Sequence, residues 1–305
     1  MSFLQKAFIN IHPLLQLAMI ICVSGTALIF GAVVSMIIFE DSPLIANAVG
    51  LILGMGSGAF TYTKLMSRGK GIGFNSENIT NNLVLFFLGT IGIVYLFSPI
   101  MDLSYRLNKW LLVEGSDIYN IVELLETESL RITKEFLVMD NPSEFFVALI
   151  CIAVVPAIFE EYLFRGALQP LFAKWTGNIH AGIWISAFLF SFVHFQFFGL
   201  IPRMLLGALF GYLLIWSGSI YTAILGHFIN NASAVVAAYV LGSDWIDENM
   251  DPTHLPEPGI FEYSSAFIFS LIIAVIAFFM NRASVWPENK AIYLERERSQ
   301  DHLSL

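Results

Sequence analysis

Residues 153–168 have the sequence AVVPAIFEEYLFRGAL. The run is apolar enough for a membrane interior, yet Glu160, Glu161 and Arg165 lie within six consecutive residues at its centre. A single charged side chain at the middle of a bilayer costs at least about 2.5–3.5 kcal/mol. Because such charges persist only when they pair or serve a function, the stretch predicts a membrane-spanning helix with a polar site on it.

The composition of the whole chain agrees with this prediction. Of its 305 residues, 57% are hydrophobic and 13% are charged, whereas soluble domains carry about 25% charged residues. The sequence has no basic patch or basic motif, which argues against nucleic-acid binding. Cys22 and Cys151 both lie in apolar stretches, so we expect buried small hydrophobic residues and not a disulfide or a metal site.

Eight stretches approach the roughly 20 apolar residues that a spanning helix needs. The sequence therefore predicts an all-α polytopic membrane protein, a bundle of about eight transmembrane helices. Their predicted limits are 14–39, 44–66, 82–101, 144–172, 180–198, 201–216, 219–241 and 261–281. No clear cleavage site follows the first stretch, so we expect it to be retained as a helix and not removed as a signal peptide. Pro156 and Pro170 are expected to kink the fourth helix or to end it early.

Two polar connections divide the chain. Residues 102–143 carry mixed charge with an acidic excess, and the apolar spacing within 117–137 predicts an amphipathic helix on the surface. Residues 242–260 carry five acidic residues and no Lys or Arg. Within one integrated membrane domain, we expect an N-terminal part at 1–143, a transmembrane core at 144–241 and a C-terminal part at 242–305.

The distribution of Lys and Arg predicts the orientation. With eight spans, most basic residues outside the 102–143 connection fall on one side, so both termini are predicted to be cytoplasmic and the 242–260 connection to lie outside. These basic residues are Lys6, Lys64, Arg68, Lys70, Lys174, Arg282, Lys290, Arg296 and Arg298. Arg203 falls on the opposite side, where we expect it to snorkel or to line a cavity.

The two adjacent glutamates have different predicted roles. Glu161 and Arg165 are four residues apart on one helix face and can pair. Glu160 points about 100° away from Glu161, so the arginine does not obviously neutralise it. We interpret Glu161 and Arg165 as a structural ion pair and Glu160 as a free carboxylate suited to general-base work on water. The alternative is a buried ion network that only locks helices together.

Two further predicted helices carry polar residues in apolar surroundings. Phe190 and His194 are four residues apart, as are His227 and Asn231, so each pair shares a helix face. Singly, such residues are more often structural hydrogen-bonding groups. Together with Glu160 on a third helix, they form a set that can hold a water molecule or a divalent metal such as zinc and polarise a carbonyl group.

On the predicted limits, these residues lie at different depths. Glu160 is in mid-helix, His194 is nearer the outer end of its helix and His227 is nearer the inner end. A shared site therefore requires the fifth helix to extend or tilt, or the limits to be wrong by a turn or more.

Glycines recur at four-residue spacing in two predicted helices, at Gly50, Gly54 and Gly58 and at Gly207 and Gly211. This spacing predicts close helix packing. The packing run also explains Ser57, which lies between two glycines, better than a serine nucleophile does. The sequence contains no His-Glu-x-x-His and no Gly-x-Gly-Asp motif.

Three short motifs occur in order across roughly residues 145–240. They are Glu-Glu-x-x-x-Arg at 160–165, Phe-x-x-x-His at 190–194 and His-x-x-x-Asn at 227–231. In type, order and spacing they resemble the CPBP intramembrane proteases, which include the CAAX prenyl endopeptidases of the Rce1 type and the bacterial Abi proteins. Each motif alone is weak, but three in order are specific. The eight-helix count also fits this family.

The resemblance implies an intramembrane endopeptidase in which Glu160 and His194 activate a water molecule. His227 and Asn231 would complete the site, as metal ligands or as donors to the developing oxyanion. By motif match, Glu161, Arg165 and Phe190 would support it. The family is commonly described as metalloproteases, although a metal-independent glutamate mechanism has also been argued. Zinc or another divalent metal, held by Glu160, His194, His227 and Asn231, is therefore an expectation.

The expected partners are membrane lipid and a membrane-associated protein or peptide substrate. CAAX-type processing, peptide maturation and bacteriocin self-immunity are open assignments within the family. The alternative is a non-enzymatic transporter or scaffold that uses the same polar cluster. Transporters often show repeated halves with broken helices in matching positions. The sequence shows no such repeat, which favours a single catalytic cavity. The connection at 102–143 maps to no function shared with the family.

Overall fold

The structure is a computed structural model and describes residues 8–9, 11–67, 83–250 and 259–284. Every regular element in these ranges is helical, as the sequence predicted. The α-helices are α2 (Pro13–Ile38), α3 (Pro43–Thr61), α4 (Leu83–Leu96), α5 (Ser98–Leu111), α6 (Asp117–Leu137), α7 (Pro142–Ala148), α8 (Val155–Leu163), α9 (Gln169–Thr176), α10 (Ile179–Phe192), α11 (Leu200–Ser217), α12 (Ile220–Met250) and α13 (Ile260–Arg282). Short π-helical segments occur at Tyr62–Met66, Leu149–Val154 and Phe164–Leu168, and a 3₁₀ turn at Phe197–Gly199.

Among the described residues, six helical segments are long and apolar enough to cross a membrane. They are Pro13–Ile38, Pro43–Met66, Pro142–Thr176, Phe197–Ser217, Ile220–Gly242 and Tyr263–Arg282. A seventh crossing is possible if Val84–Leu96 and Ser98–Leu111, which meet at a bend of 46°, count as one span. The remaining predicted stretch corresponds to α10, an apolar helix of only 14 residues. The all-α membrane bundle is confirmed, and the chain is an integral membrane protein.

Several predicted limits differ from the observed ones. The fifth predicted helix, 180–198, ends early at Phe192, and Phe195 just beyond has a positive φ of 55° that no helix accommodates. The third predicted helix bends near Phe97, and the chain then continues as α5 into the segment predicted to be a polar connection. Pro99 lies in the first turn of α5, a place that suits proline because no N–H partner is needed there.

Other predicted elements are observed as expected. The amphipathic helix predicted at 117–137 is α6, and its N-cap Ser116 accepts a hydrogen bond from the Tyr119 amide. The predicted end of the seventh helix coincides with an interruption of α12 at Gly242, where φ is 83°. Of the residues that predicted the orientation, Lys6, Arg68, Lys70, Lys290, Arg296 and Arg298 lie outside the described residues.

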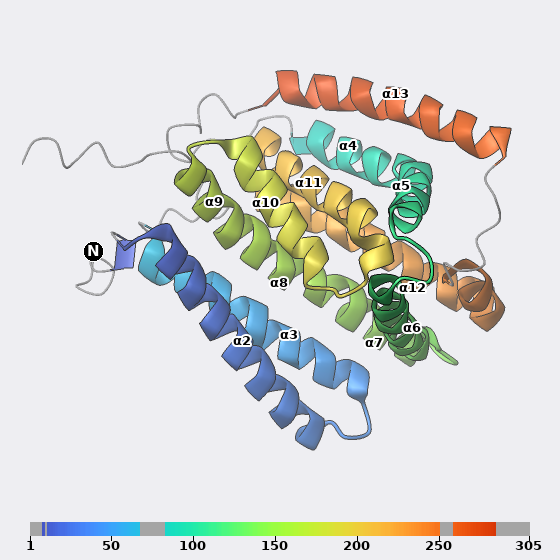
Figure 1. The fold of residues 1–305 in the computed structure, drawn as a ribbon, viewed down its shortest axis with the longest axis horizontal. Helices are drawn as coiled ribbons and strands as arrows, with labels where there is room; N and C mark the ends of the chain where they lie inside the picture. The colour runs from blue at the N-terminus through green and yellow to red at the C-terminus, as the bar shows by residue number, and fades with distance from the viewer. Residues whose placement is uncertain (1–7, 10, 68–82, 251–258, 285–305) are drawn as a thin grey trace, which may run out of the picture.

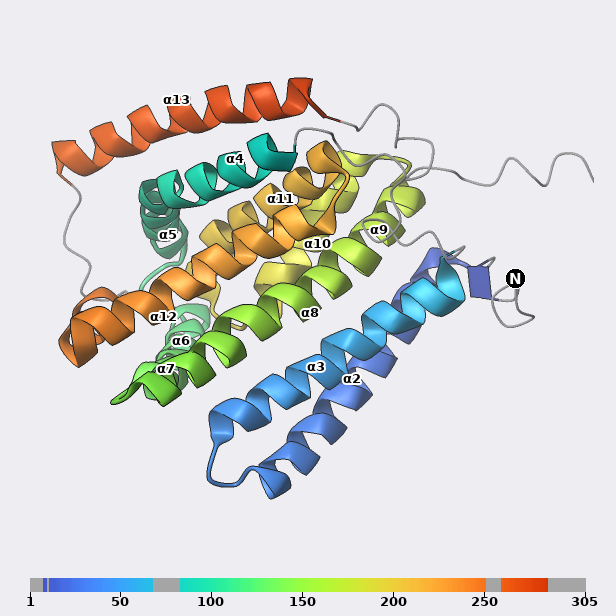
Figure 2. The same cartoon turned by 180° about the vertical axis from the view of Figure 1, so that it is seen from behind.

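The helices pack as successive layers (Figures 1 and 2). The α2–α3 hairpin lies along α8, the helices α10, α11 and α12 lie beyond it, and α4, α5 and α13 cover the opposite side. Helix α8 therefore runs between the N-terminal hairpin and the remaining helices. The predicted division at residues 143 and 241 stays a prediction, and helices of all three parts contact one another.

Close helix packing at the spaced glycines is confirmed. A Cβ atom at Gly54 would lie 2.7 Å from Cβ of Leu28, and one at Gly211 would lie 2.7 Å from Oε1 of Gln169. The burial predicted for Cys22 is wrong, because its position on α2 leaves it exposed on the outer face of the bundle. Cys151 is buried, as expected.

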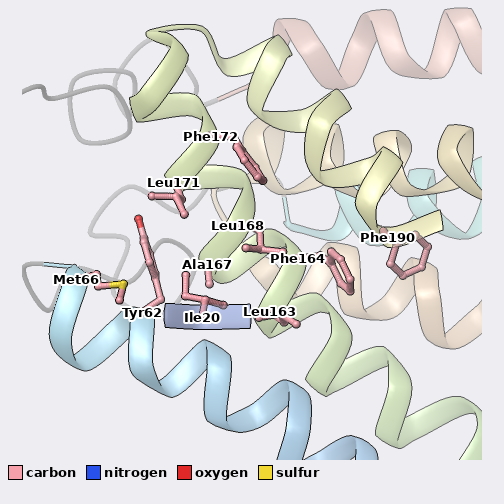
Figure 3. Close-up of a cluster of buried hydrophobic side chains, with 10 residues drawn as sticks. All are labelled: Ile20, Tyr62, Met66, Leu163, Phe164, Ala167, Leu168, Leu171, Phe172 and Phe190. Atoms are coloured by element: carbon pink, nitrogen blue, oxygen red, sulfur yellow. The ribbon is translucent and has the colours of Figure 1, made fainter. Parts of the chain in front are cut away.

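A cluster of buried apolar side chains joins the hairpin to the long helix that carries the glutamates (Figure 3). Ile20 of α2 and Tyr62 at the end of α3 pack with Leu163, Phe164 and other residues around the Phe164–Leu168 segment. Phe190 of α10 belongs to the same cluster. The apolar core therefore extends to the residues that flank the predicted site.

Candidate active site

The glutamates lie on a continuous helical span, Pro142–Thr176, of 35 residues. Two π-helical segments, Leu149–Val154 and Phe164–Leu168, flank the short helix α8, which carries Glu160 and Glu161. Such segments widen the helix by one residue and occur often at functional sites. Neither Pro156 nor Pro170 ends the span early, since each lies in the first turn of a new α-helical segment.

Glu161 and Arg165 form the ion pair that their spacing predicted. Nη1 of Arg165 lies 2.9 Å from Oε1 of Glu161, and the two side chains are 1% and 0% exposed. Nη2 of the arginine donates to the Gly207 carbonyl of α11 at 2.8 Å. The guanidinium also lies 4.5 Å from the centre of the Phe190 ring. The arginine thus links the glutamate helix to both α10 and α11.

Glu160 lies between two histidines from other helices. Its Oε2 atom is 3.9 Å from Nε2 of His194 and 3.9 Å from Nε2 of His227. This oxygen is buried and has no hydrogen-bond partner among the residues that the structure describes. Both distances are too long for direct hydrogen bonds, so the glutamate oxygen contacts neither ring nitrogen directly.

The partners of the two histidines fix their tautomers. Nδ1 of His194 lies 2.7 Å from the Phe190 carbonyl, and Nδ1 of His227 lies 2.9 Å from Oε1 of Glu161. Both partners accept hydrogen bonds, so each Nδ1 carries a hydrogen, and in a neutral ring of this tautomer Nε2 is the acceptor. Two acceptor nitrogens from different helices therefore each lie 3.9 Å from the unpartnered oxygen of Glu160. A water molecule has two hydrogens to donate, so it can bind to two of these acceptors at a time.

Two contacts of His227 were not predicted from the sequence. Glu161 joins His227 as well as Arg165, so the supporting ion pair also orients a histidine of the site. Phe210 of α11 stacks on the His227 ring, with centroids 5.4 Å apart and an interplanar angle of 18°. Spacing within a helix carries no signal for either contact, because both join separate helices.

Asn231 lies one turn beyond His227 but is engaged elsewhere. Its Nδ2 donates to the Ile152 carbonyl at 3.0 Å, and its Oδ1 accepts from Asn230 at 3.1 Å. Pro156 has no N–H to offer the carbonyl four residues before it, so the asparagine provides a donor for Ile152. The predicted role of Asn231 alongside Glu160 stays a prediction.

The expected metal has no closed set of ligands here. Among the residues that the structure describes, no three His, Cys, Asp or Glu side chains lie close enough to hold a metal ion. The Asn231 amide is turned to Ile152 and Asn230. As they lie, the residues do not fit a bound metal, and the metal expectation stays a prediction.

The early end of α10 removes the depth difference expected from the sequence. A helix of 14 residues is about 21 Å long, less than the roughly 30 Å of the hydrocarbon core. The turn that carries His194 therefore follows a helix shorter than the hydrocarbon core, and Nε2 of the histidine lies 3.9 Å from Oε2 of Glu160. Arg203, which the sequence placed on an unfavourable side, donates to Gln196 of the same turn.

One comparison with known proteins matches the part of the chain that contains these residues. A family model described as "Type II CAAX prenyl endopeptidase Rce1-like" matches residues 142–233, the segment that contains all three motifs. No curated protein matches the chain, and no solved structure does. The segment that carries Glu160, His194 and His227 is therefore similar to the Rce1-like type II CAAX prenyl endopeptidases.

Proposed function

We propose that the protein is an intramembrane endopeptidase that hydrolyses peptide bonds of membrane-associated substrates. The observation that carries this proposal is the convergence of two Nε2 lone pairs on the buried, unpartnered Oε2 of Glu160. Within the described part of the chain, neither Nε2 atom has a protein donor, and an unsatisfied buried carboxylate oxygen is costly for folding alone. A function in binding water explains why such a group is retained.

In the proposed reaction, Glu160 is the general base. It takes a proton from a water molecule that His194 and His227 orient, and the water oxygen attacks the carbonyl carbon of the scissile bond. The C–N bond then breaks, and Glu160 returns the proton to the leaving amine. Glu161 and Arg165 position His227, and Phe190 positions His194 through its carbonyl.

The exposure of the three side chains suggests where a substrate approaches. Glu160 and His227 are 8% and 5% exposed, whereas His194 is 30% exposed. The site is therefore most open beside His194, at the turn after α10. A substrate peptide bond that enters from that side would meet the bound water first, because Glu160 is more deeply buried.

The proposal is tested with purified protein in detergent and a membrane peptide as substrate. Wild type is compared with Glu160→Ala and His227→Ala, and with Glu123→Ala and His180→Ala as controls, because Glu123 and His180 are exposed. We expect loss of cleavage in the first two variants only. Retained cleavage in both would contradict the mechanism.

The same assay addresses the metal and the substrate class. Chelator treatment followed by addition of zinc or another divalent ion tests the predicted cofactor: a metal enzyme loses activity with the chelator and regains it with the ion. A prenylated peptide and its unprenylated counterpart, compared at equal concentration, test CAAX-type processing against other peptide maturation or self-immunity.

A further inference from the structure

The turn that carries His194 has an unfavourable backbone. Among the described residues, Phe195 is the one non-glycine residue with a positive φ, at 55°. Residues in this region persist when the surrounding structure holds them there, and they cluster at functional sites. Whatever holds residues 195–199 therefore also fixes the position of the preceding histidine.

Two side chains from the segment before the long helix bind the backbone of this turn. Asn108 of α5 is buried, and its Nδ2 donates to the carbonyls of Phe197 and Phe198, the latter at 2.8 Å. Glu126 of α6 accepts a hydrogen bond from the Phe198 amide at 3.2 Å. Donors and an acceptor some 70 to 90 residues away thus satisfy backbone groups that no continuing helix satisfies.

Apolar packing and charge reinforce these bonds. Phe198 is 1% exposed and packs in one cluster with Tyr119 and Val122 of α6 and with Tyr105 of α5. On the other side of the turn, Arg203 of α11 donates to the Gln196 carbonyl at 3.2 Å and to its side-chain Oε1. Arg203 also interacts electrostatically with Glu126 and Glu160.

We infer that Asn108 and Glu126 are positioning residues for His194, and that α5 and α6 act as a clamp on the turn at residues 195–199. The effect on catalysis rests on the function proposed above. The clamp holds Nε2 of His194 at its place opposite Glu160. Misplacement of a reacting group by about 1 Å can reduce a rate by about 100-fold. This assigns a function to the segment that the sequence left without one.

The first test measures cleavage kinetics. Asn108→Ala removes both donors, Glu126→Ala removes the acceptor, and Glu126→Gln keeps an acceptor oxygen at the same reach. Asn120→Ala and Glu123→Ala on the exposed side of α6 are matched controls. We expect kcat to fall about 10- to 100-fold in the two alanine variants, with KM nearly unchanged. Glu126→Gln and both controls should stay close to wild type.

The second test does not depend on activity. The rate of diethylpyrocarbonate modification is measured at His194 by mass spectrometry, with exposed His12 as the internal reference. Release of the turn should speed modification of His194 several-fold in Asn108→Ala and Glu126→Ala and leave His12 unchanged. If these variants fail to fold, Glu126→Asp, which keeps the charge but shortens the reach to Phe198, is expected to show the same acceleration.

The outcomes separate the clamp from the proposed function. If His194→Ala abolishes cleavage while the clamp variants keep the wild-type kcat, the clamp inference is overturned and the protease function stands. If the wild type does not cleave the peptide, or if His194→Ala still cleaves it, the proposed function fails. The modification rate of His194 alone then decides whether α5 and α6 hold the turn in place. An unchanged rate at His194 in folded clamp variants overturns the inference.

Discussion

The two adjacent glutamates differ in their hydrogen-bond partners, although they are neighbours in the sequence. Glu161 has an arginine and a histidine on one of its oxygens, whereas the Oε2 atom of Glu160 has no partner. Both side chains are buried. A buried charge with a partner stabilises the arrangement around it, while one without a partner costs stability. The two residues should therefore respond oppositely to neutralisation.

We expect Glu160→Gln to abolish cleavage without lowering stability, because it removes an unpartnered buried charge. Glu161→Gln should destabilise the protein by about 3–5 kcal/mol, since it leaves the Arg165 charge buried without a counter-ion. Denaturant unfolding of both variants in detergent measures the difference. A Glu160→Gln variant that is less stable than Glu161→Gln would contradict the assignment of roles.

Asn231→Ala should destabilise the protein by about 1–3 kcal/mol, because the Ile152 carbonyl loses its side-chain donor. Asn230→Ala removes only one bond to the Asn231 side chain and should cost less. Unfolding measurements on the two variants check the ranking. Equal stabilities for Asn231→Ala and wild type would show that the Ile152 bond contributes nothing, and a lowered kcat in that variant would support the predicted catalytic role.

At this scale, the sequence predicted contacts within a helix and missed contacts between helices. The four-residue spacing was enough for Glu161 and Arg165, because both lie on one regular face. The bond between His227 and Glu161 depends on how α12 packs against α8, which no local spacing encodes. The same reason explains why Asn108, Glu126 and Phe210 were not identified.

At the scale of the elements, long apolar stretches were predictable and their interruptions were not. No glycine or proline in the sequence marks the end of α10. Contacts with the rest of the structure hold Phe195 in its left-handed backbone conformation. Because α5 carries polar residues, the sequence predicted a connection from residue 102, where a helix in fact continues to Leu111. The glycine spacing, in contrast, indicated correctly where helices approach each other, because a residue without a side chain lets two helix backbones come close together.

Gly54→Ala should destabilise the α2–α3 hairpin by about 1–3 kcal/mol, because its Cβ would lie 2.7 Å from Cβ of Leu28. Gly25→Ala on α2 is the matched control, since no described atom outside its own stretch of helix lies within 4 Å of its Cβ position. That change should be neutral or stabilising by up to about 1 kcal/mol, from helix propensity alone. Thermal unfolding in detergent compares the two, and equal effects would mean that the close approach is not tight.

At the scale of the whole molecule, the packing agrees with one feature of the predicted orientation. Nζ of Lys174 lies 6.0 Å from the centre of the Tyr62 ring, so the ends of α3 and α9 lie together. These are two of the ends that the Lys and Arg distribution assigns to the cytoplasm. The clamp helix α6 follows the opposite end of the α4–α5 pair, so the orientation also decides on which side of the membrane the clamp lies.

We predict that α6 lies outside the cytoplasm and that the end of α13 lies in it. Single cysteines at Asn120 and Arg282, both exposed, report the two sides once Cys22 and Cys151 are replaced by serine. In intact bacterial spheroplasts, an impermeant maleimide should label Asn120→Cys at once and Arg282→Cys only after permeabilisation. The reverse pattern would contradict the orientation and place the clamp on the cytoplasmic side. Labelling of both positions before permeabilisation would mean an even number of crossings between them, which is what α10 predicts if the short helix returns without crossing.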